Sequence, residues 1–236
     1  MATNTGHTVK AFDDDIDQLR ALISQMGGLA EAAIADATQA LARKDTELAL
    51  RVIEGDKRID QLEIEVEKLA VRLIALRAPM ANDLREVVAA LKTAGVIERI
   101  GDYSKNIAKR VAVFAESNPI APMTIVPEMA RVVAQMVKSA LDAFVARDAE
   151  LAARVRERDK TVDDFYNSLF RTLLTYMMEN PNHITASAHL LFIAKNLERI
   201  GDHATNIAEM VYYSATGLYL DEREKGQDTL TAPAVG

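Results

Sequence analysis

The chain has 236 residues, of which 49 % are hydrophobic and 27 % charged, and a formal net charge of −7. The negative charge disfavours nucleic-acid binding, which usually needs a basic surface. The chain has no cysteine, which excludes disulfides and thiolate metal sites, and no uncharged apolar run of about 18 residues that would span a membrane. Aromatic residues make up only 5 % of the chain, and its alanine, leucine, glutamate and arginine favour helices over sheets.

The first long pattern is a helix over about residues 10–42, after a polar lead at 1–10 that we expect to be disordered. Its apolar residues recur in steps of three and four, the heptad spacing of a helix that packs against others. They are Phe12, Ile16, Leu19, Ile23, Met26, Ala30, Ala33, Ala37 and Leu41. The adjacent Gly27 and Gly28 weaken this helix by about 1 kcal/mol each relative to alanine.

Two more helical patterns complete the first half. The second helix follows Asp45, a residue suited to cap its N-terminus, and ends near Arg77 because Pro79 disfavours helix at the residue before it. Asn82 or Asp83 is the predicted cap of the third helix, which runs to about Ala115. Residues 117–127 hold three of the six prolines and form the predicted linker.

The second half of the chain repeats the first. Residues 98–102, Glu-Arg-Ile-Gly-Asp, recur unchanged at 198–202, and Asn-Ile-Ala follows at 106–108 and again at 206–208. An identity at a fixed offset inside matching helical patterns indicates internal duplication. The predicted fold is therefore all-α, with two tandem three-helix bundles at 10–116 and 128–217, the linker 117–127 between them and a flexible tail at 221–236.

Paired acidic residues occur on two helices of each half. Asp56 and Asp60 are four residues apart and so share one helix face, and they lie about as far before the first turn as Glu98 and Asp102 lie after it. The second half has the same arrangement, and antiparallel helices joined by a short loop pack side by side. Each bundle should therefore gather four carboxylates at one level. They are Asp56, Asp60, Glu98 and Asp102 in the first and Asp159, Asp163, Glu198 and Asp202 in the second.

Four neighbouring carboxylates repel one another, so a compensating cation is expected. All-oxygen ligation favours iron(III), manganese, magnesium or calcium, and zinc also fits. Gly101 and Gly201, inside helices, mark close approach of backbone or ligand. Residues that could support the site from outside are Arg99, Asn106, Arg199 and Asn206. The alternative is a solvated acidic face, or one paired with Lys57 and Lys160.

These features resemble the PhoU family, the regulators of bacterial phosphate uptake. Residues 76–85, from Leu76 to Arg85, are similar to that family's turn between its second and third helices, and the acidic pairs match its acidic motifs. The second turn, at 180–183, departs from the family form. The resemblance covers about residues 10–220 and implies two similar three-helix bundles.

The resemblance also implies a function. Some family members hold multinuclear iron or zinc clusters on the acidic motifs, and the family acts by association, not as enzymes. They repress phosphate-starvation signalling by linking the phosphate-specific ABC transporter to a sensor histidine kinase at the inner membrane. We therefore expect a cytoplasmic homodimer, peripheral to the membrane through its partners, with no nucleic-acid partner and no membrane span. The rival functions are a metal-free helical scaffold and a di-metal carboxylate enzyme, which would need Glu-x-x-His pairs that do not accompany these motifs.

Overall fold

The computed structural model describes residues 5–115 and 121–220, which are helical and contain no strand. The elements are α1 (Thr5–Arg43), α2 (Thr46–Arg77), α3 (Asn82–Ala108), α4 (Val111–Ala115), the 3₁₀ turn η1 (Ala121–Ile125), α5 (Val126–Ala146), α6 (Ala149–Glu157), α7 (Asp159–Glu179), the 3₁₀ turn η2 (Pro181–His183) and α8 (Ile184–Thr216). The predicted all-α class is therefore confirmed. The predicted tail at 221–236 lies outside the described residues.

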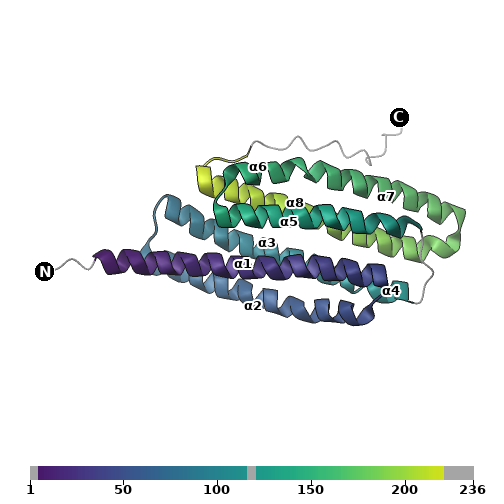
Figure 1. The fold of residues 1–236 in the computed structure, drawn as a ribbon, viewed down its shortest axis with the longest axis horizontal. Helices are drawn as coiled ribbons and strands as arrows, with labels where there is room; N and C mark the ends of the chain where they lie inside the picture. Colours follow the sequence, from purple (N-terminus) through teal and green to yellow (C-terminus); the bar gives the residue numbers. More distant parts are fainter. Residues whose placement is uncertain (1–4, 116–120, 221–236) are drawn as a thin grey trace, which may run out of the picture.

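The helices form two three-helix layers that lie against each other (Figure 1). One layer contains α1, α2 and α3, and the other contains α5, the α6–α7 pair and α8, with α3 packed on α8 and α1 on α5. Tyr103 and His203, at equivalent positions of the two copies, stack across the α3–α8 contact with ring centroids 5.4 Å apart. Equivalent residues meet in this way only near a local two-fold axis, so the duplication predicted from the sequence is also a spatial one.

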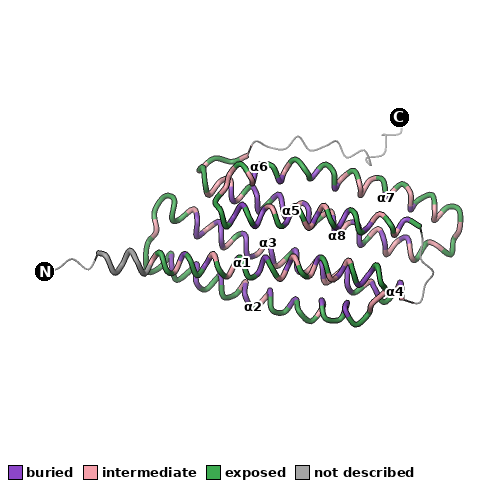
Figure 2. Tube along the Cα trace, viewed as in Figure 1, coloured by how far each residue is buried: buried purple, intermediate pink, exposed green. Residues whose placement is uncertain are grey.

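The core lies between the helices, along the seams that the spacing predicted (Figure 2). Leu19, Ile23 and Met26 of α1 are at most 1 % exposed, and Ile100 and Ile200 at the duplicated motif are fully buried. Complete burial of such a side chain stabilises a fold by about 1.5–3 kcal/mol. The apolar seams therefore supply a core that does not depend on a bound metal.

Two aspartates begin equivalent helices in the two copies. Asp45 accepts a hydrogen bond from the backbone N–H of Leu48, at 2.9 Å, in front of α2. Asp148 does the same for Leu151 in front of α6, at the same distance. Such caps satisfy one of the orphan donors of the first turn, and this confirms the cap predicted at Asp45.

Four predicted helix boundaries need correction. α1 begins at Thr5, not near residue 10, because no proline interrupts the chain there. α5 begins at Val126, inside the predicted linker, with Pro127 in its first turn, where a missing N–H costs nothing. Residues 117–120 of that linker lie outside the described residues.

The other two corrections are interruptions of helices that were predicted to be continuous. α3 ends at Ala108 because the Arg110 guanidinium donates to the Asn106 carbonyl, at 2.8 Å, which satisfies an acceptor that the helix would otherwise use. The repeat predicts one continuous helix in the second half as the counterpart of α2, but it is divided at Arg158 into α6 and α7, because the Arg158 N–H bonds three residues back, to the Val155 carbonyl, as in a 3₁₀ turn.

A charged junction links the two copies. Glu86 of α3 is only 8 % exposed and accepts a hydrogen bond from Arg20 of α1, at 2.7 Å. Its other carboxylate oxygen lies 3.1 Å from a guanidinium nitrogen of Arg147, between α5 and α6. One carboxylate therefore pairs with an arginine from each copy.

Candidate functional site

The two acidic motifs of the first copy meet where α2 packs against α3. A Cβ atom placed on Gly101 would lie 2.9 Å from Ile59 Cδ1 and 3.1 Å from Asp56 Oδ1, so the glycine lets the two helices approach closely. Asp56 is 5 % exposed at this contact. The motif of α2 therefore lies level with the motif of α3, as their equal distances from the turn predicted.

A lysine lies between the two motifs. The Lys105 ammonium forms an ion pair with Asp56 Oδ2 and lies 2.7 Å from Asp102 Oδ1. The hydrogen bonds that Lys105 donates to Asp102 and Asp56 raise the pKa of its ammonium group, which keeps it charged. The second oxygen of Asp56, Oδ1, is buried and makes no hydrogen bond to any described residue.

Two other acids of this cluster, Asp60 and Glu98, have raised pKa values because of burial and neighbouring negative charges. Burial, then Asp102, Glu63 and Asp60, raise the pKa of Glu98 to about 7. Burial and the neighbouring Asp56 raise the pKa of Asp60. Glu63 was not among the predicted site residues, although it lies seven residues after Asp56 and so continues the same stripe of α2.

The second copy repeats the arrangement with a looser helix contact. A Cβ atom on Gly201 would lie 3.4 Å from Val162 of α7, an ordinary packing distance. Burial, then Glu198 and Asp163, raise the pKa of Asp202 to about 6, and burial followed by Glu198 raises that of Asp163. The three acids therefore lie close enough to repel one another.

Two further predicted acids of the second copy, Asp159 and Glu198, each have a buried part. Asp159 is 1 % exposed. The Lys195 ammonium lies 2.7 Å from Glu198 Oε1, and Glu198 Oε2 is buried without a hydrogen bond to any described residue. Each copy therefore offers a buried carboxylate oxygen that lacks a hydrogen-bond donor.

The basic partners are not the predicted ones. Lys57 and Lys160 are exposed, and the ion pairs are made by Lys105 in the first copy and Lys195 in the second. These two lysines are not equivalent, because Thr205 matches Lys105 and Gly95 matches Lys195 at the 100-residue offset. The duplicated acids have thus acquired different counter-charges.

The predicted supporting residues border the α3–α8 seam. The Arg199 guanidinium carbon lies 5.7 Å from the centre of the Tyr103 ring, and Asn206 lies 3.4 Å from Nδ1 of His203. Burial, then Arg99 and Arg199, lower the pKa of His203. Asn106 takes part through its backbone, because its main-chain carbonyl accepts a hydrogen bond from the Arg110 guanidinium.

The carboxylate oxygens of the two clusters are of the kind that bind hard cations, but their side chains are not arranged as a complete set of metal ligands. Among residues 5–115 and 121–220, no three His, Asp or Glu side chains are placed to hold one ion together. Carboxylate oxygens suit iron(III), magnesium, manganese and calcium, and the unbonded buried oxygens of Asp56 and Glu198 favour a positive ligand. Three-carboxylate ligation would require side-chain rotation and removal of an ammonium.

The raised pKa values predict that the metal-free protein loses stability as the pH rises. Glu98 shifts from 4.5 to about 7, so the native state binds its proton more tightly than the unfolded chain. This contribution is fully present below pH 4.5 and is lost as the pH rises through 7; Asp202, at about 6, acts in the same direction. Between pH 5 and 8 in chelator, the melting temperature should fall.

The double variant Glu98→Gln with Asp202→Asn is the control for this pH effect. Neutral amides cannot lose a proton, so the variant should melt at a higher temperature than the parent at pH 8 and show a flatter profile. An unchanged slope between pH 5 and 8 would mean that the two carboxyl groups titrate normally.

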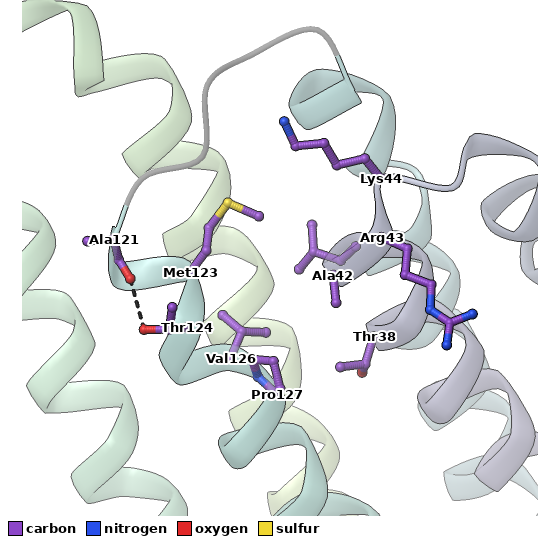
Figure 3. Close-up of a pocket in the computed structure, with 10 residues that line it drawn as sticks. Thr38, Ala42, Arg43, Lys44, Ala121, Met123, Thr124, Val126 and Pro127 are labelled. Atoms are coloured by element: carbon purple, nitrogen blue, oxygen red, sulfur yellow. Dashed lines mark hydrogen bonds between the residues drawn. The ribbon is translucent and has the colours of Figure 1, made fainter.

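A separate apolar hollow of about 600 Å³ lies between the end of α1 and the start of α5 (Figure 3). Met123 and Val126 line one side, Leu41 and Ala42 belong to α1, and the Thr124 hydroxyl is 2.9 Å from the Ala121 carbonyl that accepts its hydrogen bond. None of the eight predicted acidic residues lines it. Within the described part of the chain, no helix is both long enough and apolar enough to cross a bilayer.

Known proteins match this chain over both copies. The family model of the PhoU domain matches residues 23–111 and 126–211. A protein of Zymomonas mobilis named as a phosphate-specific transport system accessory protein PhoU homolog is 54 % identical over 98 % of this chain and 98 % of its own length. A Caulobacter vibrioides protein of the same name is 48 % identical over 96 % of this chain and 99 % of its own.

Solved structures agree with the sequence matches. The crystal structure of PhoU from Pseudomonas aeruginosa has a TM-score of 0.85 and 39 % identity and covers 88 % of this chain and all of that one. The phosphate transport system regulatory protein PhoU from Streptococcus pneumoniae has a TM-score of 0.82 and 29 % identity, with coverage of 89 % and 100 %. The two matched domains coincide with the two layers of helices, so the chain belongs to the PhoU family.

Proposed function

We propose that this protein is an accessory protein of a phosphate-specific transport system that represses phosphate-starvation signalling when phosphate is plentiful. The proposal rests mainly on relatives with that accessory name, which align with nearly the whole chain. It acts by association, not catalysis, linking the phosphate-specific ABC transporter to a sensor histidine kinase. It works as a cytoplasmic homodimer that reaches the inner membrane through these partners.

Deletion of the gene in its own host tests this regulatory role. A reporter of phosphate-starvation genes should be active in the deletion strain even in rich phosphate, because the link that silences the kinase is missing. Restoring the full chain should return the reporter to its repressed level. Continued repression in a strain without any second member of the family would contradict the regulatory role.

We also propose that the acidic clusters bind metal, with iron or zinc favoured and magnesium, manganese or calcium as alternatives. Asp56, Asp60, Glu98 and Asp102 would hold it in the first copy, and Asp159, Asp163, Glu198 and Asp202 in the second. The proposal is supported by one acid of each pair, whose pKa is raised by burial and by neighbouring acids: Asp60, Glu98, Asp163 and Asp202. The bound metal would supply positive charge that relieves their repulsion.

Removal of one cluster tests the metal proposal. The double variant Glu98→Ala with Asp102→Ala should bind about half the metal of the parent and keep its helical content, because buried apolar seams supply the core. Metal analysis of protein purified without chelator gives the ratio, and the same change at Glu198 and Asp202 is the matched variant. Equal metal content in parent and variants would place the metal elsewhere.

The competing candidate is a metal-free helical scaffold. It is favoured by Lys105 and Lys195, which neutralise part of each cluster without any ion. In that case protein purified without chelator would contain no stoichiometric metal, while the reporter experiment would still show loss of repression. The two measurements therefore separate the scaffold from the metal-binding regulator.

A further inference from the structure

We propose that Lys105 is an internal cation that occupies the metal position of the first copy, so that metal binds there only by displacing its ammonium group. This inference rests on the proposed metal-binding role. It adds that the two copies differ, because the lysine of the second copy approaches its cluster differently.

The position of the ammonium is that of a bridging cation. Its nitrogen contacts one oxygen of Asp56 on α2 and lies 2.7 Å from one oxygen of Asp102 on α3. A metal ion could bind the same two carboxylates in place of the ammonium, because carboxylate oxygens are ligands for hard cations. The ammonium and a metal ion would compete for the same two carboxylate oxygens, so binding of one excludes the other.

The charge balance favours exchange for a multivalent ion. Lys105 brings one positive charge to a cluster in which Asp56, Asp102, Asp60 and Glu98 interact. Arg99 lies near enough to Glu98 to lower its pKa, but it does not offset the effects of burial and the other acids. A divalent ion adds a further charge, and the unbonded Asp56 Oδ1 is a further oxygen for it.

The lysine also has a route out. The side chains of Lys105 and Asp102 are 24 % and 44 % exposed, whereas that of Asp56, beneath them, is 4 % exposed. An ion can therefore enter from the Asp102 side while the flexible lysine moves into water, where an ammonium is well hydrated. The acids stay anchored on two packed helices.

The second copy provides a natural contrast. Thr205 replaces the lysine, and its hydroxyl bonds to the Asp202 carbonyl of its own helix. Lys195 instead approaches Glu198 from the preceding turn and lies 5.1 Å from the centre of the Tyr166 ring. The displacement of Lys105 is therefore a property of the first copy alone.

The test measures Mn²⁺ binding to the full chain in a background carrying Glu198→Gln and Asp202→Asn, so that only the first copy is measured. Lys105→Met should lower the dissociation constant at least tenfold. Lys109→Met removes the same charge from an exposed residue one turn further along and should change it less than twofold. Lys105→Arg keeps a cation there and should not tighten binding.

Amine acetylation, measured peptide by peptide, gives a second measurement on the unsubstituted protein. Lys105 should react slowly without metal, because its ammonium is ion-paired, and at least threefold faster with saturating Mn²⁺, while the reactivity of Lys109 stays constant. Equal Mn²⁺ affinity in the background and in Lys105→Met would overturn the inference and leave the metal role intact. No binding of Mn²⁺ by any variant would also overturn the inference, whereas the metal proposal is decided by the metal content of protein purified without chelator.

Discussion

Replacement of Ile100 and Ile107 by alanine should lower the free energy of unfolding by about 2–5 kcal/mol for each residue. Ile100 is fully buried and Ile107 is 1 % exposed, so each truncation leaves a cavity that the packed helices fill only partly. The residues are two turns apart on α3, about 10 Å, so their effects should nearly add. Because domains are typically stable by about 5–15 kcal/mol, the double variant should be partly unfolded at room temperature.

Urea denaturation followed by circular dichroism measures this loss. Ile64→Ala, at a side chain of α2 that is 48 % exposed, is the control and should stay within about 0.5 kcal/mol of the parent. Because the core is apolar, saturating metal should not rescue the double variant to the parent midpoint. A midpoint shift no larger than that of the control would mean that α3 contributes little to the core.

The repeated pattern predicted the fold because its periods and lengths constrain the packing strongly. The seam of α1 is buried at most of the predicted positions from Ile16 to Leu41, as three- and four-residue steps require, but Ile34 is buried in place of the predicted Ala33, which is only partly buried. The close contact between Asp56 and Gly101 followed from equal distances to one turn. These properties depend on spacing along single helices and on one hairpin, and both are visible in one sequence.

Two features were not predicted from the spacing: the lysines that pair with the acids and the contacts between the copies. Lys105 and Lys195 are the counter-charges because their side chains reach the clusters from the same helices as the acids, whereas Lys57 and Lys160 point to solvent. The Tyr103–His203 stack depends on how α3 crosses α8, a choice that no local spacing records. Long-range packing therefore decided the ring stack, whereas Lys105 and Lys195 lie three residues from Asp102 and Glu198 on the same helices.

The packing roles of Gly27 and Gly28 were not visible in the sequence either, because it predicted the same helix-weakening effect for both. In the structure, a Cβ atom on Gly27 would lie 2.7 Å from Leu141 Cδ1 of α5, whereas nothing lies within 4 Å of one on Gly28. Gly27 is buried at the contact between the two copies, and Gly28 is exposed. One glycine therefore permits the α1–α5 approach, and the other serves no packing purpose.

This difference predicts opposite effects for the same substitution at neighbouring positions. Gly28→Leu should raise the free energy of unfolding by about 0.5–1 kcal/mol, because leucine is a better helix former and meets only solvent. Gly27→Leu gains the same propensity but forces α1 away from Leu141, and overpacking of this kind costs about 1–3 kcal/mol, so the net change should be destabilising.

Chemical denaturation of the parent and the two leucine variants measures their free energies of unfolding. Gly27→Ala is a third variant, with a smaller side chain at the same position. A single methyl group meets the flexible end of Leu141, which can rotate, so Gly27→Ala should lie within about 1 kcal/mol of the parent. The expected order of stability is Gly28→Leu, parent, then Gly27→Leu. Equal stability of the two leucine variants would show that α1 and α5 do not need the close approach, and the contact between the copies would then rest on α3 and α8 alone.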